Sequence, residues 1–212
     1  MSTPAPLHES KTRFLDAALQ VIRTKGYSAT TIDDVCQLAG LTKGSFFHHF
    51  SSKQDLALAA AAYFSSRADG LFATAPYQAL HDPLERLLGY VDFRKAILQG
   101  ELPEFTCLLG TMVQETYETH PAIRSACDKH IREHAAMLEV DIVAAKSLYA
   151  PEADWSAASL ALYAQAVIQG AFILAKAQHG AGVAADCLDH LRRYLELLFR
   201  PDEPKEEPRC VS

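Results

Sequence analysis

The sequence of 212 residues contains only five cysteines, and their arrangement does not suggest that they are joined to one another. Their number is odd, they are widely spaced, and no C-x-x-C pair occurs. A disulfide framework or a thiolate zinc site is therefore not expected, and the pattern is typical of a protein of the reducing cytoplasm. The cysteines are Cys36, Cys107, Cys127, Cys187 and Cys210.

A long uninterrupted apolar run is also lacking. The most apolar stretch, residues 160–177, is interrupted by Gln165, Gln169 and Lys176, whereas a membrane-spanning helix needs about 20 mostly apolar residues. This stretch therefore predicts a buried helix. Residues 1–11 do not contain the apolar segment of a secretory signal, so we expect a cytoplasmic protein.

Motifs for nucleotide binding and for hydrolysis are missing as well. The sequence contains no P-loop, no G-x-G-x-x-G and no G-x-S-x-G pattern, which are turns that hold phosphates or a nucleophilic serine. We therefore expect no enzyme, and we predict no catalytic residue, no cofactor and no metal.

The sequence does have a large apolar fraction and an unevenly distributed charge. Hydrophobic residues make up 49% and charged residues 22%, which is the balance of a globular protein with a sizeable core. The net charge is −6, but residues 1–53 contain six basic and four acidic residues, and the remainder contains 14 basic and 22 acidic residues. Because phosphate binding needs local cations, this division fits a nucleic-acid-binding head on an acidic body.

Apolar residues recur with helical spacing throughout, and no stretch sustains a period of two, so we predict an all-α fold of about nine helices. Ser, Thr or Asp before a helix and Gly after it set several of the predicted ends. Residues 1–8 and the tail 201–212 are expected to be disordered because they have little to bury. The predicted helices cover residues 10–25, 32–39, 43–49, 53–64, 83–99, 104–118, 121–147, 154–179 and 184–199.

Two of the short predicted helices share a tight corner at Gly40 and Leu41, which gives a helix-turn-helix pattern over residues 31–50. In this motif the second helix enters the major groove of DNA. The amides at the start of that helix favour phosphate, and Gly44 lets the backbone come close. The residues that we expect at DNA by this reasoning are Thr30, Thr31, Thr42, Lys43, Gly44, Ser45, His48 and Lys53.

Residues 14–60 resemble the DNA-binding head of the tetracycline-repressor (TetR) family. The matching pieces occur in order and without gaps; they are Gly26-Tyr27, Ala29-Thr30-Thr31, Ala39-Gly40, Lys43-Gly44-Ser45, His49-Phe50 and Ser52-Lys53. The resemblance implies that DNA is faced by Lys43, Gly44, Ser45, Phe47 and His48, and that backbone phosphates are held by Thr31 and Lys53. The family usually has tyrosine where this chain has Phe47, whose ring cannot bond a phosphate but can press on a sugar or a thymine methyl.

The resemblance further implies a repressor that a small-molecule effector releases from double-stranded operator DNA. We therefore expect a DNA-binding domain over residues 8–53 and a ligand-binding and dimerisation domain over residues 54–200. A homodimer is needed because two recognition helices must meet half-sites about 34–36 Å apart, or a multiple of that distance.

The body contains residues that could serve these two roles. Apolar stripes on the last two predicted helices could form the dimer; they contain Leu160, Tyr163, Ala164, Val167, Ile168, Ala171, Leu174, Leu188, Leu191, Tyr194, Leu195 and Leu198. Candidates for the ligand pocket are Phe105, Leu108, Met112, Glu115, His134, Met137 and Tyr163.

An alternative function comes from residues 130–134, which match the H-x-x-E-H pattern of one group of zinc peptidases. His130 and His134 stand four apart on one helix face, close to Cys127, and a metal-binding protein or enzyme would need a third ligand there. The apolar periodicity of this helix favours a core or pocket role for His134 instead. A helical head that binds a protein rather than DNA is a further alternative.

Overall fold

The computed structural model describes residues 9–199, and this part of the chain folds into ten α-helices and one short 3₁₀-helix, with no strand. The all-α prediction is therefore confirmed. The predicted disordered segments, 1–8 and 201–212, lie outside the described residues. The elements are α1 (Glu9–Lys25), α2 (Ile32–Ala39), α3 (Lys43–His49), α4 (Lys53–Ala73), η1 (Pro76–Ala79), α5 (Pro83–Ala96), α6 (Leu102–Phe105), α7 (Leu108–Thr116), α8 (Pro121–Tyr149), α9 (Ala157–Gln178) and α10 (Gly182–Phe199).

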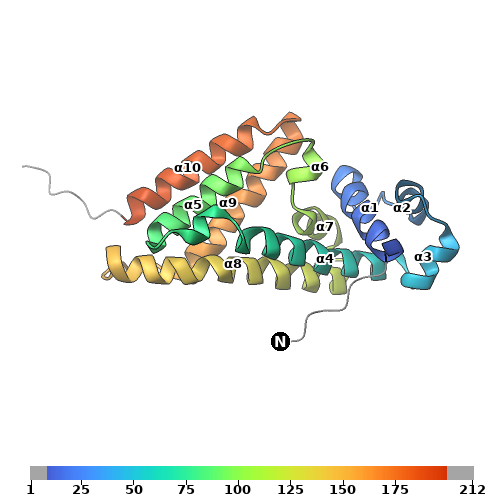
Figure 1. Ribbon diagram of the computed structural model, residues 1–212, viewed down its shortest axis with the longest axis horizontal. Coiled ribbons are helices and arrows are strands. Elements are labelled where there is room, and N and C mark those ends of the chain that lie inside the picture. The colour runs from blue at the N-terminus through green and yellow to red at the C-terminus, as the bar shows by residue number, and fades with distance from the viewer. Residues whose placement is uncertain (1–8, 200–212) are drawn as a thin grey trace, which may run out of the picture.

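Helices α1, α2 and α3 gather at one end of the molecule, while α4 and α8 run side by side along one edge toward the other end (Figure 1). The three head helices pack around Phe14, whose ring centroid lies 5.6 Å from that of Phe46 and 6.2 Å from that of Phe50. All three rings are buried. Because Phe46 lies in the middle of α3 and Phe50 caps its end, this aromatic cluster packs the short helix against α1.

The body consists of α4 to α10, and α9 packs between α8 and α10. Helix α9 is long and apolar enough to cross a membrane, with a mean hydropathy of 1.6 over its most apolar window. Its buried residues, among them Leu160, Ile168 and Phe172, belong to the apolar core that α5, α8 and α10 also share. We therefore interpret α9 as the core helix that its sequence predicts.

Several predicted helices have different bounds in the structure, and two of these differences have a clear local cause. The segment predicted as one helix over 104–118 is divided into α6 and α7, because Thr106 and Cys107 adopt extended backbone conformations. Pro103 lies in the first turn of α6. Cys107 is the N-cap of α7, and its thiol accepts a hydrogen bond from the amide of Gly110. Helix α9 begins after Ser156 rather than at residue 154, because the Ser156 hydroxyl caps its first turn.

The apolar core of the head does not stop at the predicted domain boundary after residue 53. The same buried cluster includes Leu56 and Ala60 of α4, Met112 of α7, and Ile123 and Cys127 of α8. Further along α4, Phe72 is buried in the core of the body instead. Helix α4 is therefore a single rigid element that is packed at one end against the head and at the other against the body.

Candidate nucleic-acid interface

The corner between α2 and α3 is built by a left-handed residue and two backbone hydrogen bonds. Gly40 has φ of 63° and ψ of 37°, a conformation that favours glycine because it has no Cβ. The amides of Gly40 and Leu41 donate to the carbonyls of Gln37 and Cys36. The chain then enters α3, where the Thr42 hydroxyl accepts a bond from the amide of Ser45.

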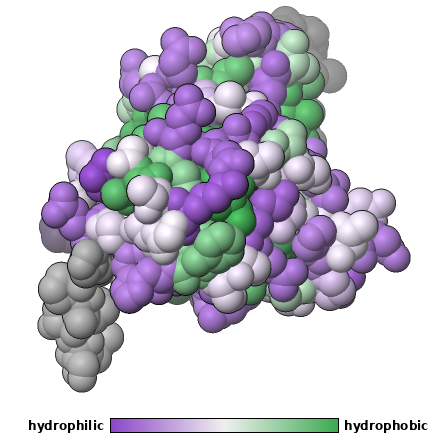
Figure 2. Space-filling view, turned by 90° about the vertical axis from the view of Figure 1, so that its right-hand side faces the viewer, coloured by the Kyte–Doolittle hydropathy of each residue, from purple (hydrophilic) through white to green (hydrophobic). Residues whose placement is uncertain are grey.

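This arrangement presents one face of α3 to solvent. Thr42, Lys43, Gly44, Phe47 and His48 are exposed, whereas Phe46 on the opposite face is completely buried. Phe47 exposes 56% of its surface although it is a large apolar residue. Figure 2 looks onto this end of the molecule and shows mainly hydrophilic side chains with small apolar patches between them. The structure thus brings five of the sequence-predicted contact residues onto one exposed surface, which we call the α3 face.

Lys43, the cation on the α3 face, is paired within the head. Its ammonium nitrogen lies 2.7 Å from a carboxylate oxygen of Asp33 on α2. The hydrogen bond and charge of Asp33 raise the pKa of Lys43 above its ordinary value. Both side chains are largely exposed, so this ion pair is open to exchange for a phosphate partner.

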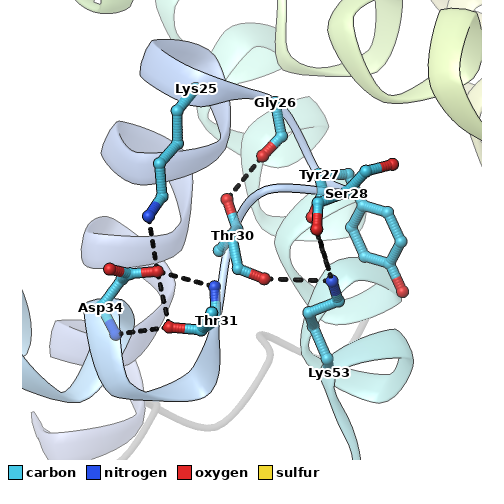
Figure 3. A network of polar contacts seen from close by, with 8 residues as sticks. All are labelled: Lys25, Gly26, Tyr27, Ser28, Thr30, Thr31, Asp34 and Lys53. Atoms are coloured by element: carbon cyan, nitrogen blue, oxygen red, sulfur yellow. Dashed lines mark hydrogen bonds and ion pairs between the residues drawn. The ribbon is translucent and has the colours of Figure 1, made fainter.

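Thr30 lies in the segment that joins α1 to α2, and Lys53 at the start of α4 points toward this segment (Figure 3). Thr30 is buried, and its hydroxyl donates to the carbonyl of Gly26 at 2.6 Å. The Lys53 ammonium donates to the carbonyls of Thr30 at 3.0 Å and of Tyr27 at 3.1 Å, and it lies 4.4 Å from the centroid of the Tyr27 ring. In this state both side chains hold the turn between α1 and α2.

Thr31 begins α2 with a reciprocal cap that it forms with Asp34. Its hydroxyl accepts from the amide of Asp34 at 3.1 Å, and the Asp34 carboxylate accepts from the amide and the hydroxyl of Thr31. Lys25 at the end of α1 lies 2.6 Å from the same carboxylate. The hydrogen bond of Lys25, followed by those of Thr31, holds the pKa of Asp34 well below its usual range. The start of α2 is therefore tied to the end of α1.

Contacts from the body hold the same turn. The Glu115 carboxylate on α7 accepts from the amides of Tyr27 at 3.2 Å and Ser28 at 2.8 Å. Arg23 on α1 donates to the carbonyl of Thr106, in the segment between α6 and α7, at 3.3 Å. Nothing in the local sequence indicates these contacts, because 88 residues separate Tyr27 from Glu115.

A small cavity of about 50 Å³ lies in the body between α4, α5, α8 and α9. Two of the seven candidate pocket residues, Phe105 and His134, are in its wall. The wall also contains Arg94 and Gln165, which were not among the predicted pocket residues. The other candidates lie elsewhere. Leu108 and Met112 are completely buried in the head core, and Glu115 holds the turn described above. Met137 and Tyr163 expose 41% and 46% of their surfaces.

The two histidines of the H-x-x-E-H pattern have other partners. The Nε2 atom of His134 lies 2.7 Å from a guanidinium nitrogen of Arg94 and 3.0 Å from the Tyr90 hydroxyl. Burial, followed by the charge of Arg94, lowers the pKa of His134 to about 3. Nδ1 of His130 pairs with Glu133 at 2.9 Å. Among residues 9–199, no group of three possible metal ligands occurs, so the described residues do not support a metal site here.

The helices predicted to form the dimer have an inner and an outer apolar face. Seven residues of the predicted stripes are buried within the body; they are Leu160, Ala164, Ile168, Ala171, Leu188, Leu191 and Leu195. Tyr163, Leu174 and Tyr194 are exposed instead. Leu162, Ile173 and Leu197 are also exposed on α9 and α10, although they were not among the residues predicted to form the dimer. We call these six exposed residues the α9/α10 face.

Comparison with known proteins gives two matching family models. One is described as bacterial regulatory proteins of the tetR family and matches residues 14–60. The other is described as the C-terminal domain of LmrA/YxaF-like transcriptional regulators and matches residues 83–183.

Individual relatives carry similar descriptions. The uncharacterized HTH-type transcriptional regulator YerO of Bacillus subtilis is 36% identical over 58 residues, which are 27% of this chain and 20% of YerO. The transcriptional regulator AcuR of Cereibacter sphaeroides is 32% identical over 112 residues, which are 51% of this chain and 48% of AcuR. The crystal structure of a TetR transcriptional regulator from Chloroflexus aurantiacus matches with a TM-score of 0.77 at 26% identity, covering 89% of this chain and 94% of that one.

Proposed function

Because the chain belongs to the TetR family of transcriptional regulators, we propose that it is a repressor that a small-molecule effector releases from a double-stranded DNA operator. The observation that carries this proposal is the α3 face, where Thr42, Lys43, Gly44, Phe47 and His48 are exposed together at the end of the molecule. A regulator of this kind acts in the cytoplasm and is not an enzyme.

On the α3 face we assign phosphate binding to Lys43 and base reading to His48. Lys43 would exchange Asp33 for a phosphate when DNA arrives. Phe47 would press its exposed ring on a sugar or on a thymine methyl. Ser45, which is partly buried, would contribute from the edge of the face.

Around this face we assign a supporting role to the start of α2. The hydroxyl of Thr31 and the ammonium of Lys53 would reach the flanking phosphates only by leaving the partners described above. Thr30, which is buried, would act on the DNA indirectly by keeping the turn in shape.

The second part of the proposal is a homodimer that joins two chains through the α9/α10 face. Large apolar side chains that a monomer exposes together are typical of an interface. The rings of Tyr163 and Tyr194 already contact each other across the two helices, with centroids 5.2 Å apart and an angle of 56° between their planes. A two-fold pairing of this face would give an assembly with two α3 faces, one for each half-site of an operator.

The third part is coupling between effector and DNA through α4 and the segment between α6 and α7. We assign residues 8–53 to DNA binding and residues 54–200 to effector binding and dimerisation, with α4 packed against both cores. Phe105 and Cys107 line the cavity, and between them Thr106 accepts a hydrogen bond from Arg23 of the head. A ligand in the cavity would therefore act on the orientation of α1. A coupling of about 1–3 kcal/mol would change DNA affinity roughly 5- to 150-fold.

The test is DNA binding by the purified protein, measured as fluorescence anisotropy of a labelled duplex taken from the region that flanks its own gene. We expect a dimer that binds this duplex, and we expect Lys43→Ala to lower the salt dependence by about one unit of slope. Lys129→Ala, which removes an exposed lysine of α8, is the control. A monomer at micromolar concentration that binds no duplex at low salt would refute the proposal.

A further inference from the structure

Arg94 is a cation in the wall of the cavity that has no carboxylate partner. It extends from α5 and is partly buried, and its guanidinium carbon lies 4.3 Å from the centroid of the Phe72 ring. Among residues 9–199, none of the ion pairs involves Arg94. A guanidinium removed from water is costly unless an anion accompanies it. The cavity therefore contains an uncompensated positive charge.

The neighbours of Arg94 are neutral and hold it in one orientation. A guanidinium only donates hydrogen bonds, so Nε2 of His134 must accept the bond at 2.7 Å and the ring carries its proton on Nδ1. The Tyr90 hydroxyl lies 3.0 Å from the same Nε2 atom, and it accepts hydrogen bonds from Nε of Arg94 at 2.9 Å and from Gln165 at 3.3 Å. These bonds use two of the five N–H groups of Arg94, which leaves donors for a further acceptor.

The remaining wall is apolar and the space is small. Aromatic and aliphatic side chains such as Phe64, Phe105, Ile131 and Phe172 line most of it. A cavity of about 50 Å³ holds roughly three to five groups of the size of a water molecule. The one carboxylate in the wall, Asp69, is exposed and forms no ion pair with Arg94. These properties suit a ligand with an anionic end and a short apolar tail.

We propose that the effector is a short-chain monocarboxylate whose carboxylate pairs with Arg94 while its hydrocarbon tail fills the space beside Phe105 and Phe172. This proposal rests on the proposed function only in calling the ligand an effector. The planar fork of the guanidinium matches a carboxylate in two parallel hydrogen bonds, which favours a carboxylate over an anion of other shape.

The test compares three probes that differ in charge but little in size: sodium propionate, propionamide and propylammonium chloride. Isothermal titration calorimetry measures their binding to the full chain, with sodium chloride at equal ionic strength as the blank. We expect propionate to bind at millimolar concentration or below and at least about tenfold more tightly than propionamide, because hydrogen bonds to a charged group are the stronger ones. Propylammonium should not bind, and octanoate should bind more weakly than propionate because it is too long.

Variants of Arg94 test whether propionate binds at this residue. Arg94→Gln should lower the affinity for propionate at least about tenfold, and Arg94→Lys, which keeps the charge but loses the fork, should give an intermediate value. Lys95→Gln is the matched control, because it removes a cation that pairs with Asp189 on the surface of the same helix. If Arg94→Gln does not fold, as judged by circular dichroism, Arg94→Lys and the three probes still decide.

Release of operator DNA is measured in parallel, so that the two proposals can fail separately. Propionate that binds to a protein without DNA affinity would support the ligand class and refute the regulator. A protein that binds DNA but prefers propionamide or propylammonium, or whose affinity for propionate is unchanged in Arg94→Gln, would overturn the carboxylate proposal and leave the regulator intact.

Discussion

The carboxylate of Glu115 lies 2.8 Å from the backbone amide nitrogen of Ser28, so that a side chain of the body holds the turn that leads into α2. Its other oxygen accepts from the amide of Tyr27. Together with the bond from Arg23 to the carbonyl of Thr106, this contact connects head and body beside α4. The head and the body are therefore connected at two points besides α4.

Glu115→Ala should destabilise the protein by about 1 kcal/mol, because two backbone amides lose their acceptor. The amide of Tyr27 is the more costly one, since Tyr27 is buried. Urea unfolding followed by circular dichroism measures the change. Glu118→Ala removes an exposed glutamate just after α7 and should change the free energy of unfolding little; equal losses in both variants would show that the contact with the head contributes nothing.

Gly26→Ala should destabilise the head by about 1–3 kcal/mol, because the substitution combines a strained backbone with a steric conflict. Gly26 has φ of +86°, and a Cβ atom there would collide with the Glu115 carboxylate. Thermal unfolding measures the effect. Gly180→Ala is the control, since no atom lies within 4 Å of the Cβ that it would gain. A Gly26→Ala protein as stable as this control would contradict the tight packing of the turn against α7.

The head could be predicted from the sequence because its signals are local. The Thr31 cap, the left-handed Gly40 and the Thr42 cap each act within four residues, and they follow one another without interruption. Helical periodicity also places Phe14 on the inner stripe of the first helix, and Phe14 is completely buried in the structure. The helix-turn-helix spacing predicts that α3 binds in the major groove, and the family resemblance adds the expected roles of single residues such as Phe47.

The cavity could not be predicted in the same way because its polar residues come from crossing helices. Arg94 and His134 are 40 residues apart, and only the packing of α5 against α8 brings them together. The sequence of α7 predicts an apolar side, but it does not reveal that Met112 on this side enters the head core rather than the cavity. In α8 the H-x-x-E-H pattern offers a metal ligand at His134 as an alternative, but it gives no sign of Arg94, the cation of α5 that donates a hydrogen bond to this histidine.

Asp33→Asn should tighten DNA binding at low salt by up to about fivefold. In the wild type Lys43 must break its ion pair with Asp33 before it can bind a phosphate, and an exposed ion pair of this kind contributes about 0–1 kcal/mol. The change also removes a negative charge next to the α3 face. Anisotropy titrations at several salt concentrations measure it. Asp186→Asn, at an exposed position on α10, makes the same change in net charge far from α3. Equal gains in both variants would mean that only net charge matters.

His134 should make the folded protein less stable as the pH falls from 7 to 5. Its pKa is about 3 in the folded chain, against an ordinary value of 6.5, so between these values the unfolded chain binds a proton that the folded chain does not. The free energy of unfolding then falls with pH, by about 2 kcal/mol between pH 7 and pH 5.

Urea unfolding at both pH values, on the wild type and on His134→Gln, isolates this contribution because the other eight histidines are common to both proteins. Glutamine keeps an acceptor for Arg94 but does not titrate, so the variant should lose about 2 kcal/mol less than the wild type over this range. If both proteins lose the same amount, His134 takes up its proton in the folded state, and the neutral ring required by the Arg94 hydrogen bond is ruled out.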